Sequence, residues 1–183
     1  MSISSTRTPA RRRLPLVLAA ACSAGALLAL SSPTAVAVTP LTATATFNCG
    51  SWGNGLATLT AADNGTTKSI KLTSSAITMP AGSSADPNSI TTTLKVSKTS
   101  GGVTSQVQFS AKANPGMSYP NPITLGPLKL SSGTLAAGDS TNSVVLSAPA
   151  TATNWSLQIV TSSPTSATVY CVATSVQSAP FVW

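Results

Sequence analysis

Short stretches in which apolar and polar residues alternate one by one constrain the fold of this chain more than any other feature. In LTATATFNC, residues 41–49, every second residue is apolar: Leu41, Ala43, Ala45, Phe47 and Cys49. A period of two places successive side chains on opposite faces of a β-strand. Beyond the N-terminal leader, no apolar stripe recurs at helical spacing, so we expect an all-β protein.

The clearest pair of strands lies in the middle of the chain. Residues 89–98, SITTTLKVSK, and residues 103–113, VTSQVQFSAKA, both alternate, and the glycines 101 and 102 supply a turn between them. This pattern predicts a hairpin whose apolar face includes Val103. A later strand, NWSLQIV, aligns three apolar residues in the same way: Trp155, Leu157 and Ile159.

The number and spacing of these strands indicate the fold class. Eight or nine short strands, with a turn roughly every 8–12 residues, are typical of an antiparallel two-sheet sandwich of immunoglobulin-like architecture, which we predict. A closed β-barrel is the alternative. In ITLGPLKL, the apolar phase shifts across Gly126-Pro127, which predicts a β-bulge or an edge position there.

The first 37 residues have the features of a secretory signal peptide. Arginines precede an apolar run at residues 14–30, and Ala35 and Ala37 fit an A-x-A cleavage site. We therefore divide the chain into a signal peptide, residues 1–37, and a single β-sandwich domain, residues 38–183. An uncleaved membrane anchor is disfavoured, because the run is short and contains Pro15. We expect a secreted protein, extracellular or associated with the cell wall, without a stable membrane span after cleavage.

The three cysteines predict one disulfide bond. Cys22 lies in the leader, and lipid attachment there is disfavoured because Ala19 stands where a leucine is usual. The other two, Cys49 and Cys171, are expected to pair in an oxidising compartment. Two free thiols that bind a metal or act in catalysis are the alternative, but the chain has no histidine to join them.

The charge of the exported part is small. It contains six lysines and three aspartates, which give a net charge of +3. The lysines are Lys68, Lys71, Lys95, Lys98, Lys112 and Lys129, and the aspartates are Asp63, Asp86 and Asp139. Lysines dispersed in this way do not form the dense basic footprint of a nucleic-acid-binding protein. We expect no nucleic acid, and a cell-wall polymer or an envelope protein is the kind of partner that fits a mild positive charge.

The residue inventory argues against catalysis. The chain has no histidine and no glutamate, and its arginines all lie in the leader. Catalytic triads, histidine metal sites and paired-glutamate chemistry are therefore excluded, and the three aspartates stand in turn sequences. We predict no catalytic residue, no metal site and no cofactor. A serine activated by a lysine is the remaining enzymatic alternative.

Two aromatic residues in loops are candidates for stacking on a ligand such as a sugar ring. Trp52 stands between glycines in SWGNG, and Tyr119 stands in the proline-rich segment 113–122. Burial of Trp52 at one end of the core is the alternative interpretation. Exposed rings on a common surface would support a polysaccharide-binding module.

Two resemblances accompany these patterns. With FNCGSWGNGLATLTAADNG and the ending YCVATSVQSAPFVW, the chain resembles uncharacterised secreted β-sandwich proteins of high-GC Gram-positive bacteria. That resemblance implies secretion and a sandwich fold, and no activity. Through SWGNGLATLTAADNG and GTLAAGDST, the chain is also similar to family 2 carbohydrate-binding modules, which stack tryptophans on cellulose or chitin. The function we expect is a secreted, non-catalytic structural or interaction role at the cell envelope or outside the cell.

Overall fold

The computed structural model describes residues 37–183, so the predicted signal peptide lies outside the described residues except for its last position. Within the described part the chain is all-β, as predicted, with one short 3-10 turn, Gly50–Trp52, and no α-helix. The strands are β1 (Thr42–Asn48), β2 (Asn54–Asp63), β3 (Lys68–Thr78), β4 (Ser84–Ala85), β5 (Ile90–Ser100), β6 (Val103–Lys112), β7 (Met117–Ser118), β8 (Pro122–Ser132), β9 (Ser140–Ser143), β10 (Leu157–Thr161), β11 (Ala167–Ala173) and β12 (Phe181–Val182).

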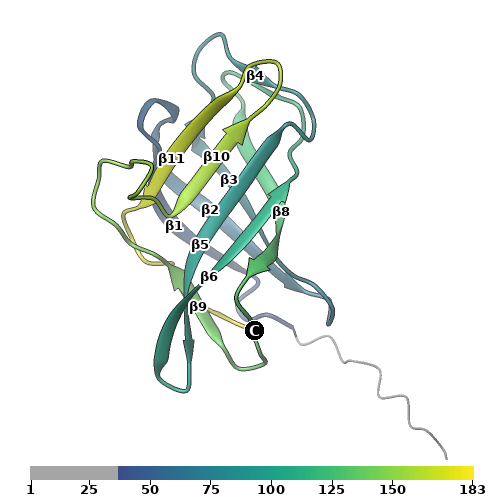
Figure 1. Cartoon of the computed structure of the whole chain (residues 1–183), viewed down its shortest axis with the longest axis vertical. Helices are drawn as coiled ribbons and strands as arrows, with labels where there is room; N and C mark the ends of the chain where they lie inside the picture. Colours follow the sequence, from purple (N-terminus) through teal and green to yellow (C-terminus); the bar gives the residue numbers. More distant parts are fainter. Residues whose placement is uncertain (1–36) are drawn as a thin grey trace, which may run out of the picture. The chain divides into compact units, whose positions relative to one another are not determined.

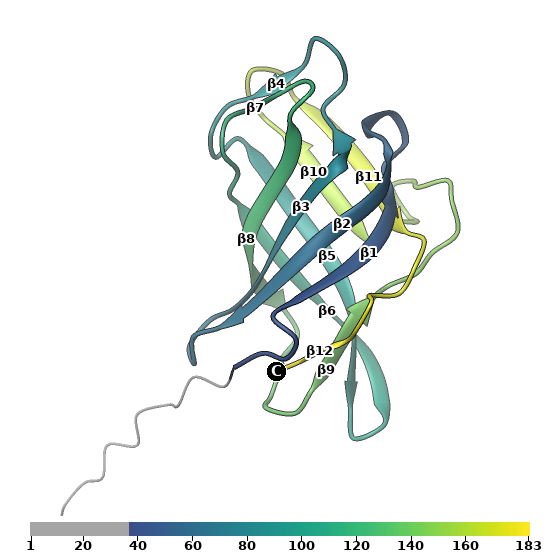
Figure 2. The ribbon, with the colours of Figure 1, turned by 180° about the vertical axis from the view of Figure 1, so that it is seen from behind.

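Eight of these strands form a closed antiparallel barrel (Figures 1 and 2). Their order is β10-β11-β1-β2-β3-β8-β6-β5, and β5 pairs back with β10 to close the ring. The lower half of β5 pairs with β9, and β9 pairs with β12, so these two short strands extend the sheet below the ring. The strands β4 and β7 pair separately at the upper end.

The prediction of a two-sheet sandwich is therefore wrong, and the stated alternative, the β-barrel, is correct. Both architectures bury one face of every strand, so both produce the same alternation in the sequence. They differ in whether the outermost strands pair with one another. Here β5 and β10, which are far apart in the chain, are joined by five residue pairs from Leu157↔Leu94 to Thr161↔Ile90.

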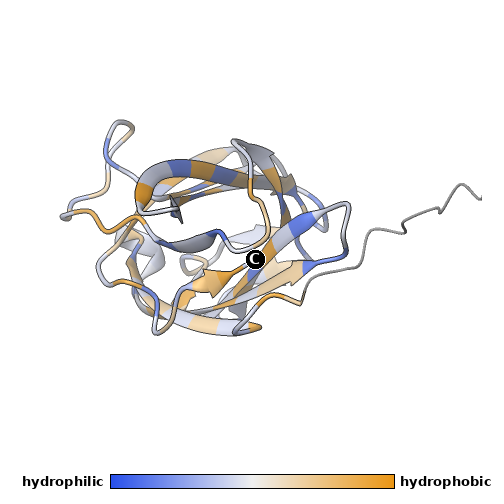
Figure 3. Cartoon of the chain, turned by 90° about the horizontal axis from the view of Figure 1, so that it is seen from below, coloured by the Kyte–Doolittle hydropathy of each residue, from blue (hydrophilic) through white to orange (hydrophobic). Residues whose placement is uncertain are grey.

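The interior of the barrel is filled by side chains. Large aromatic residues are almost fully buried there, each at most 1% exposed: Phe47, Phe109, Phe181 and Trp183. The rings of Phe109 and Trp183 stack with their centroids 5.6 Å apart. Figure 3, seen from below, shows apolar and polar positions alternating along the strands that surround this core. The barrel is thus a packed core, and any ligand would meet its ends or its outer wall.

Two local predictions are confirmed by the pairing of the strands. The central hairpin forms from β5 and β6, which pair from Thr91↔Lys112 to Ser100↔Val103. A register shift between the pairs Ile70↔Leu128 and Leu72↔Leu125 places a β-bulge at Gly126-Pro127. Gly126 has a φ of +95°, and a Cβ there would lie 2.6 Å from the backbone nitrogen of Leu128. Only glycine fits this position without strain.

Three residues that alternation assigned to the apolar face are not part of the core. Leu41 and Val103 are 62% and 70% exposed, because each stands at a strand end that the barrel does not cover. Trp155 is half-buried and precedes β10. Ser156 turns inward in its place, and its Oγ accepts a hydrogen bond of 2.6 Å from the Ala173 N–H. This hydrogen bond shifts the inward phase by one residue.

The predicted disulfide bond between Cys49 and Cys171 is present and buried. It joins the end of β1 to β11 across 122 residues of sequence, with the Cα atoms 4.1 Å apart. The glycines that follow Cys49 allow the chain to turn directly into β2. A Cβ on Gly55 would collide with the side chain of Ala76 on β3, so this close approach requires glycine.

No helix among residues 37–183 has the length and apolar character needed to cross a membrane.

Candidate functional site at the basic end of the barrel

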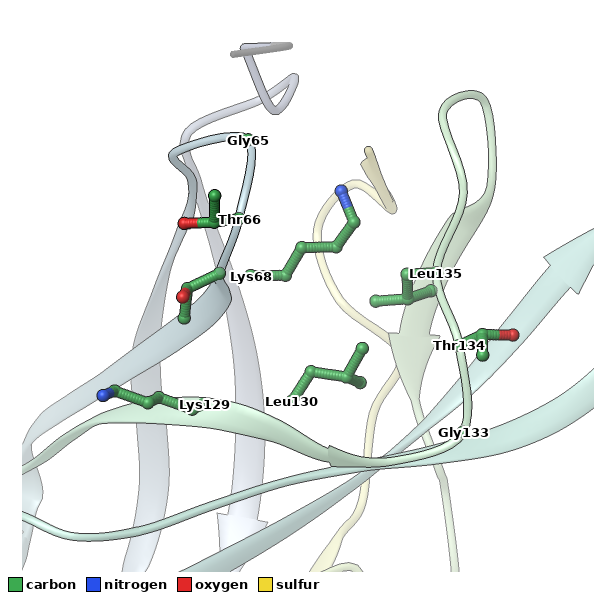
Figure 4. Close-up of a pocket in the computed structure, with 9 residues that line it drawn as sticks. Gly65, Thr66, Lys68, Lys129, Leu130, Gly133, Thr134 and Leu135 are labelled. Carbon is green, nitrogen blue, oxygen red and sulfur yellow. The ribbon is translucent and has the colours of Figure 1, made fainter. Parts of the chain in front are cut away.

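A hollow opens at the lower end of the barrel. It has a volume of about 470 Å³ and lies between the β2–β3 turn and the segment that follows β8. Figure 4 shows the Lys68 side chain extending into the space between these two segments, with Leu130 and Leu135 directed toward it. The hollow is open, with an apolar floor and a rim of backbone and threonine groups.

The ion pair of Lys68 and Asp63 lies at this end of the barrel. Both residues follow the inward phase of their strands, and the Asp63 side chain is only 4% exposed. Burial alone would raise the pKa of Asp63, but hydrogen bonds from Lys68 and the Gly65 N–H, with the charge of Lys68, lower the pKa overall. The Lys68 ammonium also lies 5.6 Å from the ring centroid of Trp183, so it contacts the core aromatic.

A second ion pair closes the loop between β8 and β9. Lys98 Nζ lies 3.4 Å from Asp139 Oδ2 and donates a hydrogen bond of 3.1 Å to the Thr134 carbonyl. Hydrogen bonds from the Ser100 hydroxyl and the Ala136 N–H lower the pKa of Asp139, and Lys98 lowers it further. The charged forms of the Asp63 and Asp139 carboxylates are thus stabilised by their lysine partners and hydrogen-bond donors, and the two ion pairs anchor this end of the barrel.

A smaller hollow of about 230 Å³ lies beside the first, and Lys129 borders both. Lys129 is exposed on the outer face of β8, where the neighbouring Leu128 points inward and is fully buried. Figure 4 shows its ammonium group directed away from the larger hollow. The other side chains of the smaller hollow are uncharged, and they come from the β2–β3 region and from Pro127.

The structure brings together three lysines that looked dispersed in the sequence. Lys71 on β3, Lys112 at the end of β6 and Lys129 on β8 are all exposed, and these three strands are adjacent in the barrel. Periodicity alone could show that each points outward. Their grouping depends on the order of the strands, which the sequence pattern did not reveal.

The two aromatic candidates for ligand stacking are not brought together as an exposed pair. Trp52 is only 5% exposed and belongs to the hydrophobic core, which agrees with the alternative interpretation of its role. Tyr119 is 53% exposed, and its N–H donates a hydrogen bond of 3.2 Å to the Ser83 carbonyl. Of the two rings, Tyr119 alone is accessible to a ligand.

A further aromatic group lies at the strands β5, β10 and β11, away from Tyr119. The ring centroids of Trp155 and Tyr170 are 6.4 Å apart with an interplanar angle of 39°, and Lys95 Nζ lies 3.5 Å from the centroid of Trp155. Desolvation by this packing lowers the pKa of Lys95. The sequence assigned Trp155 to the core and so missed this group. Lys95 covers one face of the Trp155 ring, so that face is not free for stacking.

No group of three or more histidine, cysteine or acidic side chains that could hold a metal occurs within residues 37–183. The third aspartate, Asp86, lies near the other end of the barrel, where its carboxylate accepts a hydrogen bond from the Ser163 hydroxyl.

The fold and these contacts define a disulfide-linked, closed antiparallel β-barrel with a basic outer face. No protein-family model matches the chain, and neither a curated protein nor a solved structure matches it. The two resemblances noted in the sequence therefore stay predictions.

Proposed function

We propose that the protein is exported and acts without catalysis, as a structural or interaction module at the cell envelope or outside the cell. The observation that carries this proposal is the Cys49–Cys171 bond, which joins two buried residues on β1 and β11. Disulfide bonds of this structural kind persist where thiols are kept oxidised, as they are outside the cytoplasm. The signal-like sequence of residues 1–37 supports the same location.

The packing of the barrel supports a role in binding or assembly without chemistry. The core is filled, and two of the three aspartates are held in ion pairs that stabilise the lower end. Groups that move protons in catalysis need an accessible partner and a pKa near the working pH. Asp63 and Asp139 have lowered pKa values and lysine partners, which suits a structural role.

Cell fractionation with thiol labelling tests this proposal. We expect the protein in the medium or the cell-wall fraction, shortened by its leader, with Cys49 and Cys171 unreactive until a reductant is added. A full-length cytoplasmic protein whose two thiols react without reduction would overturn the proposal. Mass spectrometry of the exported form would also locate the cleavage site, which we expect after residue 37.

Polysaccharide binding is the second candidate function, and the exposure of Tyr119 favours it. Trp52 is buried, so Trp52→Ala would disturb the core and would not test stacking on a sugar. The informative variant is Tyr119→Ala in a pull-down on insoluble cellulose, chitin and cell wall. Retention that disappears with this ring, while the melting temperature is unchanged, would support sugar stacking. Equal retention of both proteins would exclude Tyr119 as the stacking residue.

A further inference from the structure

The bulge in β8 organises the three exposed lysines on one outer face of the barrel. Lys71 lies between Ile70 and Leu72, whose partners on β8 are Leu128 and Leu125, so it stands directly beside the Gly126-Pro127 bulge. On the other side, Lys112 is the neighbour of Ala113, whose carbonyl accepts a hydrogen bond of 2.8 Å from the Gly126 N–H. The bulge is thus flanked by one lysine on each side.

Lys129 completes the group two residues beyond Pro127. Its pair partners are Ser69 on β3 and Ser110 on β6, so Lys71 and Lys112 are its diagonal neighbours. Diagonal neighbours in an antiparallel sheet are about 7–8 Å apart. The bulge interrupts this regular spacing on the β3 side, but all three lysines are exposed on neighbouring strands of one outer face, where their positive potentials reinforce one another.

This face carries the excess charge of the described part of the chain. Lys68 and Lys98 are paired with Asp63 and Asp139, and the side chain of Lys95 packs on Trp155. The remaining carboxylate, that of Asp86, is engaged by Ser163 on the β10–β11 connection, which lies across β5 from β6. Lys71, Lys112 and Lys129 form no ion pair within the described residues.

The chemistry of the face suits phosphate groups. A lysine ammonium acts as a compact point charge for phosphate, whereas planar bidentate recognition of carboxylates is the property of arginine. Residues 38–183 contain no arginine. Ser69, which borders the smaller hollow beside Lys129, adds a hydroxyl that can donate to a phosphate oxygen. The two hollows continue the basic face toward the lower end of the barrel.

We propose that the face around Lys71, Lys112 and Lys129 binds a phosphodiester polymer of the cell envelope, an inference that rests on the proposed export of the protein. A flexible chain of phosphates can contact all three lysines in turn and enter the hollows beside Lys129. The barrel would then be retained at the cell wall by charge, in a salt-dependent way.

Two other anionic partners fit the face less well. A membrane surface requires apolar side chains beside the charges, but no exposed large apolar residue lies on β3 or β8, and Val103 is at the far end of β6 from Lys112. Single-stranded nucleic acid requires aromatic side chains on which bases stack. Trp155 and Tyr170 are on the β10–β11 side of the barrel, and Tyr119 precedes β8. None of these rings therefore lies on the strands that carry the three lysines.

The test compares two triple variants that lower the net charge equally. Lys71→Gln, Lys112→Gln and Lys129→Gln are combined in the first. Exposed positions on the β10–β11 side receive acidic residues in the matched control: Thr153→Glu, Ser166→Glu and Thr168→Glu. The probe is immobilised poly(glycerol phosphate), and binding is measured at about 50 mM and about 150 mM salt, where phosphate contacts differ clearly in strength.

We expect the affinity of the lysine triple variant to be about ten- to hundredfold lower at the lower salt. Each exposed ion pair contributes about two- to fivefold to the affinity, and the variant removes three of them. The control should retain most of the wild-type affinity. An equal loss in both variants would show that only net charge matters and would overturn the assignment to this face. Tighter binding of anionic lipid vesicles or single-stranded DNA, lost in the same lysine variant, would overturn the choice of partner.

The outcome is separable from the test of export. A protein that is exported with its disulfide formed, yet does not bind the polymer, would remove this inference and leave the proposed function in place. A cytoplasmic protein with free thiols would remove the proposed function, whatever its affinity for poly(glycerol phosphate) in solution.

Discussion

The barrel is closed along two seams between strands that are far apart in the chain, and the two seams are built differently. The β5–β10 seam is a regular antiparallel ladder of five residue pairs. The β1–β11 seam has only two pairs, Phe47↔Ala173 and Asn48↔Val172. Beyond them β1 lies beside the irregular segment after β11, so a regular ladder accounts for only part of this closure.

Two backbone hydrogen bonds, two serine side chains and the disulfide bond take the place of a regular ladder. The Thr174 and Ser178 N–H groups each donate a hydrogen bond of 2.8 Å, to the carbonyls of Thr46 and Thr44. Ser178 Oγ accepts a hydrogen bond of 3.0 Å from the Thr44 N–H, and Ser175 Oγ accepts one of 2.9 Å from the Thr46 N–H. Cys49 then links covalently to Cys171 just past the last backbone pair. The comparison teaches that one seam is a regular backbone ladder, while the other combines a few backbone hydrogen bonds with serine side chains and one covalent bond.

Removal of the disulfide should produce the largest effect and should act on one seam. Cys49→Ser with Cys171→Ser frees a loop of 122 residues, which the chain-entropy model associates with about 5 kcal/mol of unfolding free energy. Urea denaturation measures this loss. Hydrogen exchange should show β1 and β11 losing protection before β5 and β10. Equal loss of protection in both seams would contradict the comparison.

The features that the sequence predicted correctly are local or depend on simple counting. The β5–β6 hairpin, the bulge at Gly126 and the pairing of the two cysteines outside the predicted signal peptide are all present. Each follows from residues close together or from having only two candidates. The closure of the barrel is different, because alternation shows which side chains point inward and not which strands are neighbours.

The candidate site shows the same limit. Lys71, Lys112 and Lys129 could be assigned to outer faces, but their grouping needs the order β3-β8-β6, which brings β8 between two strands that precede it in the chain. Trp52 illustrates the opposite case. Its glycine-rich surroundings were compatible with exposure or with burial at one end of the core, and the ring is buried, because the glycines allow the close packing of β2 on β3.

Acidification should cause the second largest loss of unfolding free energy, and it should not act on either seam. The folded-state pKa values of Asp63 and Asp139 are lowered, so the unfolded chain binds more protons than the folded one as the pH falls below about 4. The stabilisation is therefore complete above that pH and is lost as the pH falls through the folded-state pKa values. Neither seam contains a carboxylate.

Unfolding by urea at a series of pH values measures this dependence. Hydrogen exchange in acid should show the β2–β3 turn and the β8–β9 loop opening before the seams. The double variant Asp63→Asn with Asp139→Asn is the control, and its stability should vary much less with pH. A variant that keeps the full acid dependence would show that other groups carry it.

Loss of the serine hydroxyls should weaken the β1–β11 seam by a smaller amount. Each of Ser175→Ala and Ser178→Ala removes one hydrogen bond to a β1 amide, which contributes about 1 kcal/mol. Ser166→Ala, at an exposed position in the β10–β11 connection, is a matched control and should be nearly neutral. If the amide protons of Thr44 and Thr46 exchange no faster in the variants, the serines do not hold the seam.

The smallest predicted effect is a gain in stability, from a substitution in the β5–β10 seam. Thr92 pairs with Ile159 there, faces the core and is 0% exposed, and its Oγ1 has no hydrogen-bond partner. Thr92→Val replaces this hydroxyl with a methyl group of similar shape, so it should stabilise the fold by up to about 1 kcal/mol. The neighbouring Thr93→Val is the control, because Thr93 Oγ1 lies 3.0 Å from Ser110 Oγ and its loss removes a hydrogen bond. In thermal unfolding, Thr92→Val should therefore have a higher midpoint temperature than the wild type, and Thr93→Val an unchanged or lower one. A lower midpoint for Thr92→Val would mean that the Thr92 hydroxyl has a hydrogen-bond partner in solution, and that the regular seam also depends on a polar side chain.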